Sequence, residues 1–584
     1  MNQNKKIENI RHSLSHLLAA AVLETYPDTK LGIGPTIENG FYYDFLFPED
    51  TSISKDDLKK IEERMHTYIK KGLPFSKEKI SDKKAKKIFK DQEFKLDLIN
   101  EYTKEGKKLS IYKTGDIFTD LCSGNHVDNT KEINSEGFQL TNIAGAYWRG
   151  DESNQMLTRI YGVAFETKEE LDEYLENLEK AKQRDHRKLG KKLGLFVFSD
   201  LVGPGLPLFT PKGKRILDAI KNYSRKLRKE MGYKEVQTPQ INKADLFKKS
   251  GHYEKYQNDM FEAQSHYTDN EYYIKPMNCP QHTRIYASKL RSYRDLPIRY
   301  ADFAMLYRDE QPGELSGLTR LRSFSQDDGH SFCREDQIGE EFERALNGVN
   351  KALDTYRLNY FIRLSFWDKS DKDSYLGDEK LWEKSQSKLK ELVEKKNIDF
   401  EIEEGEAAFY GPKMDFIVKD SLGREWQIST IQLDINMPSR FKLEYVDENG
   451  EKQTPVMIHS ALVGSPERFF GILIEHYNGD FPTWLSPIQV KILPIAEDHF
   501  KYCENIREKL EANQIYVEID KSDDSLGKKI RNAETSKIPY ILVIGDNEIK
   551  DNSVNVRERG KENTEDMNVD GFLNKINSEI KERK

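Results

Sequence analysis

The sequence predicts a protein of several domains with mixed α+β and α/β folds, and three observations support this prediction. The 584 residues suffice for about four domains at roughly 150 residues each. From about residue 195, aromatic-rich strands alternate with helices. After Pro487, strands at 490–493, 515–519 and 540–544 alternate with amphipathic helices around 500–510 and 526–533, which is typical of a small α/β domain with a largely parallel sheet.

Composition limits the class of protein and its cellular location. The 92 Lys and Arg against 100 Asp and Glu give a net charge of −8. This total does not exclude a nucleic-acid partner, because local basic clusters such as 187–192 and 212–229 set the field that a phosphate backbone meets. The sequence has no signal-peptide layout and no apolar run near 18 residues, so no membrane segment is expected. The chain has only four cysteines, Cys122, Cys279, Cys333 and Cys503, which are too few for a disulfide framework in so long a chain. We therefore expect a reduced, soluble, cytoplasmic protein.

An N-terminal helix carries the first candidate site. Residues 7–26 have an apolar stripe at helical spacing, and His12 and His16 lie beside that stripe at i and i+4, so both imidazoles project from one side. Cys122 and His126 form a second pair. Three histidines and one cysteine are donors that a tetrahedral zinc site uses. Spacing alone leaves open the alternative of unrelated buried histidines and a core cysteine.

The segment 299–333 carries the second candidate site. Alternating apolar residues predict two strands, one through Tyr307 and one over 318–324, joined by a Pro/Gly/Ser turn. Arg308, Arg320 and Arg322 then place several guanidinium groups on one face, which suits a triphosphate. The polar cluster 326–330 follows at the end of the second strand. A solvated, charged hairpin is the alternative.

The order of residues in this segment carries a resemblance to a known family. Arg308-x-Glu310, a turn, Arg320, Phe324 and Asp328-x-His330 resemble motif 2 of class II aminoacyl-tRNA synthetases, in particular of the threonyl-tRNA synthetases. Residues 209–241, a long amphipathic helix followed by a strand ending at Pro239, resemble motif 1, although a plain surface helix would look similar. Residues 464–471 resemble motif 3, and 408–416 and 426–441 resemble the amino-acid pocket.

The resemblance implies a role for each matching residue. It implies one zinc ion per chain on Cys279, His330 and His459, a three-ligand site with an open position, and Mg²⁺ with ATP. The catalytic residues would be Arg308, Lys413, Gln432 and Arg468. The ATP contacts would be Arg308, Glu310, Arg320, Phe324, Gln427 and Arg468, with Phe324 stacked on adenine. The threonine contacts would be Gln326, Asp328, Tyr410 and Gln432.

The N-terminal part resembles the editing domain of bacterial threonyl-tRNA synthetases. The matching segments are 31–45, DLCSGNHV at 120–127, and 146–162. The resemblance implies hydrolysis of serine wrongly attached to threonine tRNA, without zinc, by His12, His16, Lys95, Asp120, Cys122 and His126. The family usually reads Cys-Arg-Gly-Pro-His, and this chain has Ser123 and Asn125 instead of the Arg and Pro. The small extra domain that usually precedes the editing domain is expected to be absent.

These observations predict the following organisation. An α+β editing domain (1–166) is followed by a helical linker (167–195), which begins with a capping box of Thr167 and Glu170. A class II catalytic core with an antiparallel sheet (196–485) precedes a C-terminal α/β domain (486–584). By resemblance the last domain binds the anticodon through Glu548 and Arg557, although a generic α/β module fits the pattern equally well.

The predicted function is ligation of threonine to its tRNA with ATP, followed by hydrolysis of mischarged seryl-tRNA. The expected partners are threonine tRNA, ATP, L-threonine and a second copy of the chain bound through the catalytic domain, with no membrane. Two alternatives remain open at this point. A non-catalytic RNA-binding or regulatory paralogue would lack a zinc ligand or a motif arginine, and a free-standing deacylase would not need motifs 1 to 3.

Overall fold

The computed structural model describes residues 3–151, 153–377, 379–396, 398–420, 423–434 and 436–584. The chain divides into two compact units, residues 1–179 and residues 180–584. No helix in the described ranges combines the length and the apolar character needed to cross a membrane.

The first unit is built around one buried helix and a sheet. The predicted helix is confirmed as α1 (Gln3–Thr25), whose apolar stripe Ile10, Leu14, Leu17 and Ala21 is buried. It contacts β3 and α2 (Lys55–Lys71). The sheet has the order β1-β3-β8-β7, with β2 attached to β3. Its strands are β1 (Lys30–Leu31), β2 (Thr36–Ile37), β3 (Gly40–Leu46), β7 (Phe138–Tyr147) and β8 (Met156–Ala164).

A smaller three-stranded sheet completes the first unit. It has the order β4-β5-β6, with β4 (Phe75–Lys79), β5 (Ser110–Thr114) and β6 (Phe118–Leu121). Helices α3 (Asp82–Ile88) and α4 (Glu93–Lys104) lie between β4 and β5 in sequence. Strand β6 contacts α1, so its C-terminal end and the following loop lie beside the histidines of α1.

The segment predicted as one helical linker contains two helices. The capping box is confirmed, because Glu170 N donates to Thr167 Oγ1 and Thr167 N donates to Glu170 Oε2, both at 3.2 Å. Helix α5 (Lys168–Arg184) follows, and α6 (His186–Leu193) starts after a break at Asp185. The Asp185 side chain accepts a hydrogen bond from Arg187 N and caps α6, because a short carboxylate satisfies an amide of the first helical turn.

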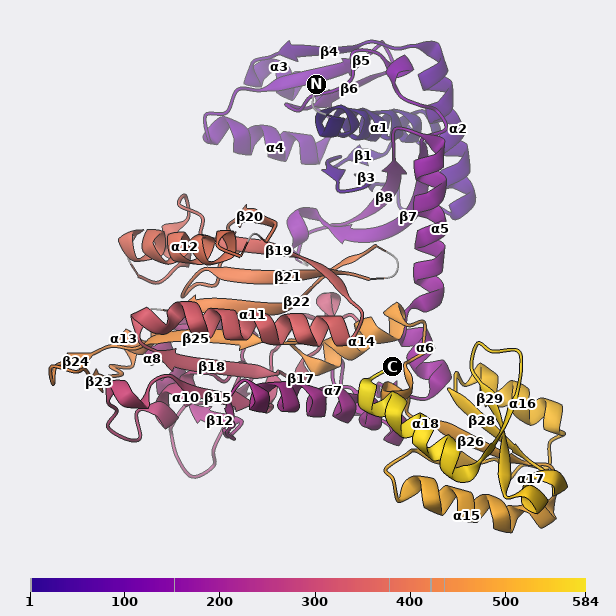
Figure 1. The fold of residues 1–584 in the computed structure, drawn as a ribbon. Coiled ribbons are helices and arrows are strands. Elements are labelled where there is room, and N and C mark those ends of the chain that lie inside the picture. The colour runs from indigo at the N-terminus through magenta and orange to yellow at the C-terminus, as the bar shows by residue number, and fades with distance from the viewer. Residues whose placement is uncertain (1–2, 152, 378, 397, 421–422, 435) are drawn as a thin grey trace. The chain divides into compact units, whose positions relative to one another are not determined.

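The centre of the second unit is an eight-stranded sheet, shown in Figure 1. Its order is β11-β15-β18-β25-β22-β21-β19-β20, and it is antiparallel except at the two outermost pairs. The strands are β11 (Lys234–Glu235), β15 (Ile298–Asp302), β18 (Asp328–Cys333), β19 (Asn359–Phe366), β20 (Phe400–Glu404), β21 (Lys413–Lys419), β22 (Glu425–Asp434) and β25 (Val456–Ala461).

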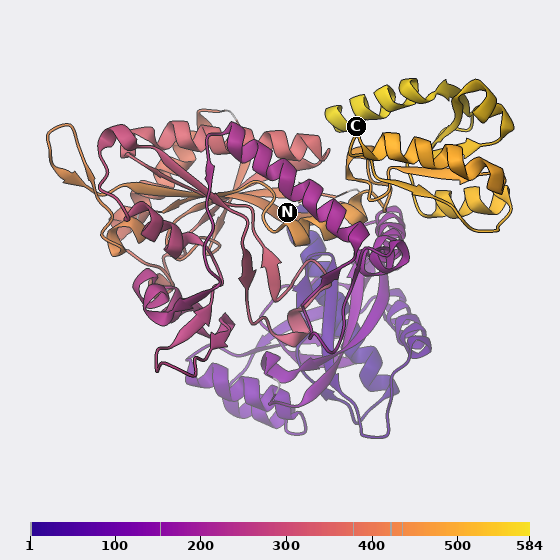
Figure 2. The same cartoon turned by 90° about the horizontal axis from the view of Figure 1, so that it is seen from below.

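Three helices pack against this sheet and each other. Helices α7 (Pro211–Glu230), α11 (Ile338–Thr355) and α14 (Pro466–His476) contribute Ile220, Val349 and Phe470 to one continuous apolar core with the strands. Helices α7 and α11 contact each other, as the view from below shows (Figure 2). The opposite face of the central strands is therefore available for a binding site.

Two details of the predicted motifs are wrong. The second strand of the hairpin covers 323–325 instead of 318–324, as β17 (Ser323–Ser325) pairs with β16 (Met305–Tyr307), and 316–322 forms a turn held by its own backbone hydrogen bonds. The cluster 326–330 does follow the end of the second strand, which ends at Ser325, although its last three residues, from Asp328, also begin the buried strand β18. The strand predicted to end at Pro239 is confined to Lys234–Glu235.

The C-terminal part has the predicted alternation of strands and helices. Strands β27 (Val517–Ile519), β26 (Val490–Pro494) and β28 (Tyr540–Ile544) are parallel, as predicted, whereas β29 (Ser553–Glu558) and β30 (Glu565–Asn568) continue the sheet antiparallel. Helices α15 (Phe500–Glu511), α16 (Leu526–Thr535), α17 (Asp546–Asp551) and α18 (Val569–Glu582) complete it.

Candidate active site and a second candidate pocket

The register of the central strands places distant residues in one row. His330 pairs with His459, His459 with Gln432, and Gln432 with Lys413. Directly paired residues point to the same face of a sheet, and residues two positions apart share that face. Asp328, two residues before His330, therefore joins the row. The strands supply a floor of polar side chains for one site.

A thiol and two imidazoles meet on this floor. Cys279 starts helix α10 (Cys279–Tyr286), and its sulfur and the ring nitrogens of His330 and His459 lie within 4.8 Å of one another. His330 Nε2 is 3.0 Å from His459 Nδ1. All three residues are buried, and burial raises the pKa of the Cys279 thiol and lowers the pKa of His330. This donor set fits Zn²⁺, and three protein ligands leave a fourth position open.

Further buried groups orient these imidazoles. His459 Nε2 lies 2.9 Å from Asp434 Oδ2, and His330 Nδ1 lies 2.8 Å from His282 Nδ1. His282 Nε2 is 3.7 Å from a carboxylate oxygen of Asp302. Imidazoles that bind metals usually give their second N–H to such partners, which fixes the tautomer. Sequence reasoning did not identify Asp434, His282 or Asp302; a histidine one helical turn after Cys279 was the available signal.

The cluster opens into a cavity of about 330 Å³. Asp328 lies in its wall, receives a hydrogen bond from Asn278 Nδ2 at 3.1 Å, and has a pKa raised by burial. The Tyr410 hydroxyl donates to Gln432 Oε1, and Lys413 Nζ lies 3.0 Å from Asp415. These groups suit a small ligand that carries amino, carboxylate and hydroxyl groups.

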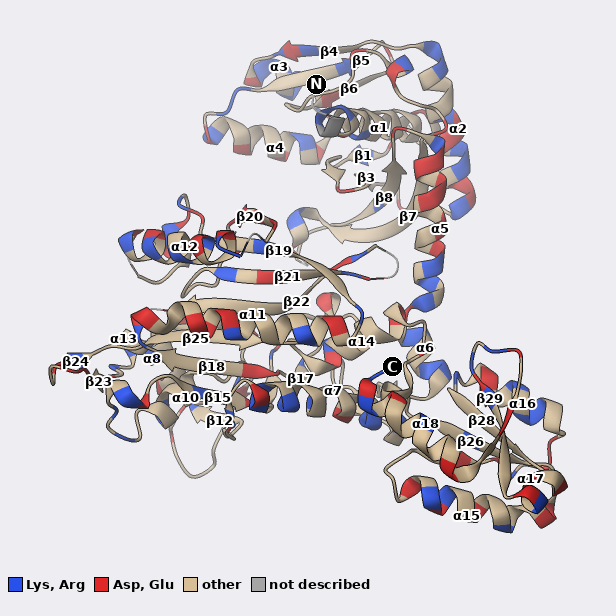
Figure 3. Cartoon of the chain, viewed as in Figure 1, with Lys and Arg blue, Asp and Glu red and all other residues tan. Residues whose placement is uncertain are grey.

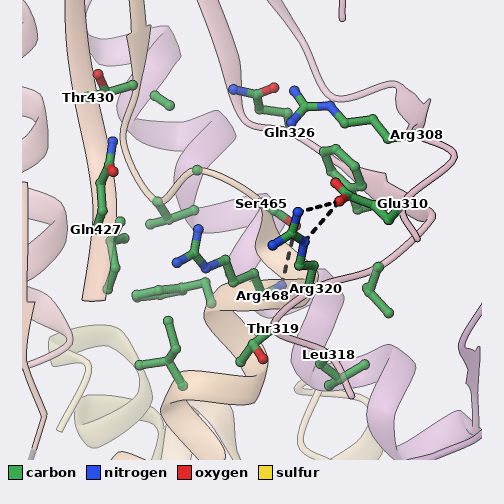
Figure 4. Close-up of a pocket in the computed structure, with 18 residues that line it drawn as sticks. Arg308, Glu310, Leu318, Thr319, Arg320, Gln326, Gln427, Thr430, Ser465 and Arg468 are labelled. Atoms are coloured by element: carbon green, nitrogen blue, oxygen red, sulfur yellow. Dashed lines mark hydrogen bonds and ion pairs between the residues drawn. The ribbon is translucent and has the colours of Figure 1, made fainter. Parts of the chain in front are cut away.

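A second cavity of about 500 Å³ contains three arginines (Figure 4). Arg308 and Arg320 come from the segment that connects β16 to β17, and Arg468 comes from the first turn of α14. Figure 4 shows the Arg468 guanidinium between Gln427 and Arg320. The wall also contains Glu310, Phe324, Gln326 and Thr430. Arg322, expected on the same face, instead donates to the Glu310 carbonyl at 2.9 Å and is not in this wall, because its segment is a turn.

The charges of this cavity are incompletely balanced. Burial, together with the charge of Arg320, lowers the pKa of Arg468, and Arg468 Nε has no hydrogen-bond partner within the described ranges. Arg320 is held by Glu310 and Glu314, each at 2.9 Å. The Arg308 guanidinium carbon lies 5.2 Å from the Phe324 ring centre. A half-buried guanidinium with an unpaired nitrogen is costly, and an anion with several oxygens would relieve that cost.

The two cavities adjoin. Arg308, Gln326, Thr430 and Ala461 line both of them. A ligand with a carboxylate in the smaller cavity can therefore meet a phosphate in the larger one beside Arg308, so the arrangement can bring two substrates together.

Two buried carboxylates connect the elements around both cavities. Glu467 of α14 accepts hydrogen bonds from Ser325 N and Oγ at 2.8 and 2.7 Å. Asp327 pairs with Arg228 of α7 at 2.9 Å and accepts from the amide of Leu462. These contacts connect the segments that resemble motifs 1, 2 and 3. The sequence offered no local signal for them, because their partners are about 100 or more residues apart.

The first unit contains its own pocket, of about 720 Å³. The donor atoms of His12, His16, Cys122 and His126 lie within 4.8 Å of one another, and Cys122 Sγ is 3.5 Å from His12 Nε2 and 3.4 Å from His126 Nε2. His12 Nδ1 lies 3.1 Å from the carbonyl of Asn125. The structure thus brings together the four residues predicted for this site.

Asp120 and Lys95 form the floor of this pocket. Lys95 Nζ lies 2.5 Å from Asp120 Oδ1, and the Tyr43 hydroxyl donates to Asp120 Oδ2 at 2.6 Å; sequence reasoning did not identify Tyr43. Burial lowers the pKa of His16 well below its usual value and raises the pKa of the Cys122 thiol to about 11. At neutral pH the imidazole is therefore uncharged and the thiol is protonated.

The two residues predicted to read the anticodon lie on neighbouring elements. Glu548 in α17 accepts a hydrogen bond from Gly545 N at 2.7 Å and caps its own helix. Arg557 in β29 pairs in register with Ile541 and lies 3.8 Å from Glu534. Both side chains thus have a contact within the chain.

Comparison with known protein families identifies three segments. Residues 261–477 match the class II core domain of tRNA synthetases (G, H, P, S and T). Residues 489–579 match an anticodon-binding domain. Residues 109–161 match the second additional domain of threonyl- and alanyl-tRNA synthetases.

Similar whole proteins agree with these matches. The threonine–tRNA ligase of Rubrobacter xylanophilus is 47% identical over 581 residues, covering 98% of this chain and 89% of that protein. The Thermosynechococcus vestitus enzyme of the same name is 45% identical, covering 99% and 96%. A crystal structure titled as the RNA-binding domain of threonyl-tRNA synthetase from Cryptosporidium parvum is 38% identical with a TM-score of 0.65, covering 68% of this chain and 98% of that one. At such identity over nearly its whole length, the chain belongs to the threonine–tRNA ligase family.

Proposed function

We propose that this chain activates threonine with ATP and transfers it to the 3′ end of threonine tRNA. The observation that carries the proposal is the pair of adjoining cavities, one with three arginines and one with the Cys/His/His cluster, which share Arg308 and Gln326. Family membership supports it. The alternative of a non-catalytic paralogue is not favoured, because every predicted zinc ligand and motif arginine is present.

The residues can be assigned to the two steps of the reaction. In the first step, a threonine carboxylate oxygen attacks the α-phosphorus of ATP, the bond to the bridging oxygen breaks, and pyrophosphate leaves. Arg308, Arg320 and Arg468 neutralise charge on the phosphates, with the Mg²⁺ that the family uses. In the second step, a ribose hydroxyl of the terminal tRNA nucleotide attacks the threonyl carbonyl and AMP leaves. Gln326, Lys413 and Gln432 orient the threonyl group throughout, which reduces the entropy lost in both steps.

We also assign the nucleotide and amino-acid contacts within the cavities. Phe324 offers a ring for the adenine, and Glu310, now paired with Arg320, is placed for its amino group. Gln427 lies opposite Arg320 (Figure 4). In the smaller cavity Asp328 accepts the threonine side-chain hydroxyl, and Tyr410 covers the ligand, its ring stacked 4.8 Å from that of His459.

Cys279, His330 and His459 would hold one Zn²⁺. The fit rests on a thiol and two imidazoles that face one another, and on Asp434 and His282 behind the imidazoles. When bound, zinc supplies a Lewis acid for the amino and hydroxyl groups of threonine. The chain's own contribution is to orient the ligands and to exclude water by burial.

We propose that the pocket of the first unit hydrolyses seryl-tRNA. The family match at 109–161 covers Asp120, Cys122 and His126, and the pocket brings these together with His12, His16 and Lys95. Neutral imidazoles can accept a proton from water as it attacks an ester. The pocket is larger than a serine needs, which suits a terminal nucleoside as well.

The proposed domains are an editing domain (1–166), a helical linker (167–195), a catalytic domain (196–485) and an anticodon-binding domain (486–584). The matched segments fall within them, and the two compact units separate inside the linker. Glu548 and Arg557 would contact anticodon bases. Arg557→Ala should then lower the rate of tRNA charging while leaving the tRNA-independent activation of threonine unchanged.

We further propose that the catalytic domain forms a homodimer. Five large apolar side chains are exposed just before α7, in the segment that leads into motif 1: Val197, Phe198, Leu201, Val202 and Leu208. Leu201 is 99% exposed, and such patches mark association sites. Sedimentation should give twice the chain mass, and Leu201→Asp with Phe198→Asp should yield monomer; a wild-type monomer at micromolar concentration would refute the dimer.

Threonine-dependent exchange of pyrophosphate into ATP tests the proposed activation directly. The wild-type chain should catalyse this exchange without tRNA. Arg468→Ala should slow it by about 10² or more, because one preorganised charge contact at a transition state contributes roughly 2.7–4 kcal/mol. A folded, zinc-loaded chain that shows no exchange with threonine would refute the proposal.

A further inference from the structure

His186 is a buried residue that connects three separate elements of the second unit. It is the first residue of α6 and is 3% exposed. Its backbone N–H and its Nδ1 contact Glu475 Oε1 of α14, at 2.9 and 2.6 Å. Its Nε2 lies 2.9 Å from the backbone N of Leu318. A backbone amide can only donate, so Nε2 accepts and the ring proton is on Nδ1, donated to Glu475.

The Leu318 contact lies in the wall of the arginine cavity. Leu318, Thr319 and Arg320 all line this cavity, and Figure 4 shows Thr319 and Leu318 below Arg320. The turn is closed by its own bonds, from Thr319 N to Ser316 O at 2.9 Å and from Ser316 N to Arg320 O at 3.3 Å. The bond from Leu318 to His186 attaches this turn to α6 and, through Glu475, to α14.

Two glycines leave space for the imidazole and the turn. A Cβ on Gly317 would lie 2.2 Å from His186 Nε2, and the φ of Gly317 is +51°. A Cβ on Gly471 would lie 3.1 Å from Leu318 Cβ and 3.6 Å from His186 Cδ2. Any larger residue at 317 would displace the ring. The space between these glycines therefore fits the His186 imidazole, which has a hydrogen bond at each ring nitrogen.

A metal-binding role for this cluster does not fit. Asp185, His186 and Glu475 place donor atoms within 4.8 Å of one another. However, both ring nitrogens of His186 already have partners, Asp185 caps α6, and Glu475 also accepts from Arg424. A metal would have to displace these bonds. The cluster is a closed hydrogen-bond network.

We propose that His186 is a positioning residue for adenylate formation, which holds the Leu318 amide and so keeps the 316–320 turn, with Arg320, at the phosphates of ATP. The proposal rests on the assignment of the arginine cavity to ATP. His186 touches no substrate, and its effect reaches ATP through the backbone of the turn. Threonine lies in the other cavity, which Leu318, Thr319 and Arg320 do not line, so its binding should be insensitive to this contact.

Two matched substitutions separate the two bonds of the ring. In His186→Asn the amide nitrogen replaces Nδ1 and keeps the donor to Glu475 but loses the acceptor for Leu318. In His186→Gln the amide oxygen reaches the Nε2 position and keeps the acceptor for Leu318. In the pyrophosphate-exchange assay, His186→Asn should raise the KM for ATP roughly tenfold, the effect of one buried hydrogen bond, with the KM for threonine within about twofold. His186→Gln should restore the KM for ATP to within about threefold.

Three results would overturn the inference: an unchanged KM for ATP in His186→Asn, an equal rise for ATP and threonine, or equal effects of Asn and Gln. If the wild type shows no exchange, the proposed function fails. The role of His186 can then still be tested by calorimetry, which measures the ratio of the ATP dissociation constants of His186→Asn and His186→Gln. If His186→Asn does not fold, hydrogen exchange on the wild-type chain replaces it. Slow exchange of the Leu318 amide supports the contact, and fast exchange refutes it.

Discussion

The buried carboxylate of Asp328 leads to a quantitative prediction about substrate choice. Asp328 is 6% exposed and burial raises its pKa. Asn278 donates to its Oδ2, whereas its Oδ1 lies 3.6 Å from His330 at the smaller cavity. A threonine hydroxyl can donate a hydrogen bond to this carboxylate. Valine has nearly the same shape but no hydroxyl, so bound valine would cover the carboxylate without giving it a hydrogen bond.

The size of the discrimination follows from this loss. Sites built to hydrogen-bond a substrate hydroxyl reject the analogue that lacks it by about 10⁴–10⁵, whereas a single missing methyl group changes selectivity by roughly 10–200-fold. Valine lacks the hydroxyl and serine lacks the methyl. We therefore expect kcat/KM for activation to fall by at least about 10⁴ for valine and by no more than about 200-fold for serine.

Pyrophosphate exchange with each of the three amino acids measures both ratios. Asp328→Ala should lower kcat/KM for threonine far more than for valine, and thereby reduce the threonine/valine ratio. The zinc content and thermal unfolding of the variant serve as controls for an intact site. Valine activation within 10-fold of serine activation would refute the reasoning, and so would an Asp328→Ala enzyme with the wild-type threonine/valine ratio.

Three other predictions concern the metal, the editing pocket and pH. Metal analysis should give about one zinc per chain, lost in Cys279→Ser but retained in Cys122→Ser; two equivalents, with one lost in Cys122→Ser, would show that the editing pocket is a metal site. The pair His12→Ala and His16→Ala should leave threonine charging nearly unchanged and let seryl-tRNA accumulate, and wild-type clearance of seryl-tRNA by this double variant would contradict the editing assignment. Burial lowers the pKa of His16 and His126, so below about pH 6.5 the unfolded chain takes up protons that the folded chain does not. Stability of the first unit should fall as pH decreases from 6.5, by up to about 1.4 kcal/mol per pH unit for each histidine; urea unfolding at pH 7 and pH 5.5 measures it, and equal stability would contradict it.

Local patterns in the sequence predicted the helices and strands that are determined by residues close together in the chain. The apolar stripe at Ile10 and Leu14 forms the buried face of α1, and Thr167 with Glu170 caps α5. Strand–helix alternation predicted the parallel strands after Pro487. Each of these signals lies within a few residues, where periodicity and capping act.

The residues that complete the sites depend on long-range register and could not be read locally. The pairing of β18 with β25 places His330 beside His459. From the sequence, the two histidines could be grouped only through the resemblance to a known family. His282, Asp302 and Asp434 orient the cluster from three different elements. The strand predicted over 318–324 failed because tertiary contacts, including the bond between Leu318 and His186, hold that segment in a turn.

The proposed chemistry of the pocket in the first unit complements that of the smaller cavity in the second unit. If the smaller cavity recognises a hydroxyl through Asp328, as proposed, it also accepts serine, and a separate hydrolytic site is needed to keep serine off threonine tRNA. In that pocket the Cys122 thiol has a pKa of about 11 and is a poor nucleophile at neutral pH. His16, by contrast, is neutral, and its Nδ1 is buried without a hydrogen-bond partner within the described ranges. We infer that a water molecule, rather than the thiol, attacks the seryl ester, and that an uncharged imidazole accepts its proton.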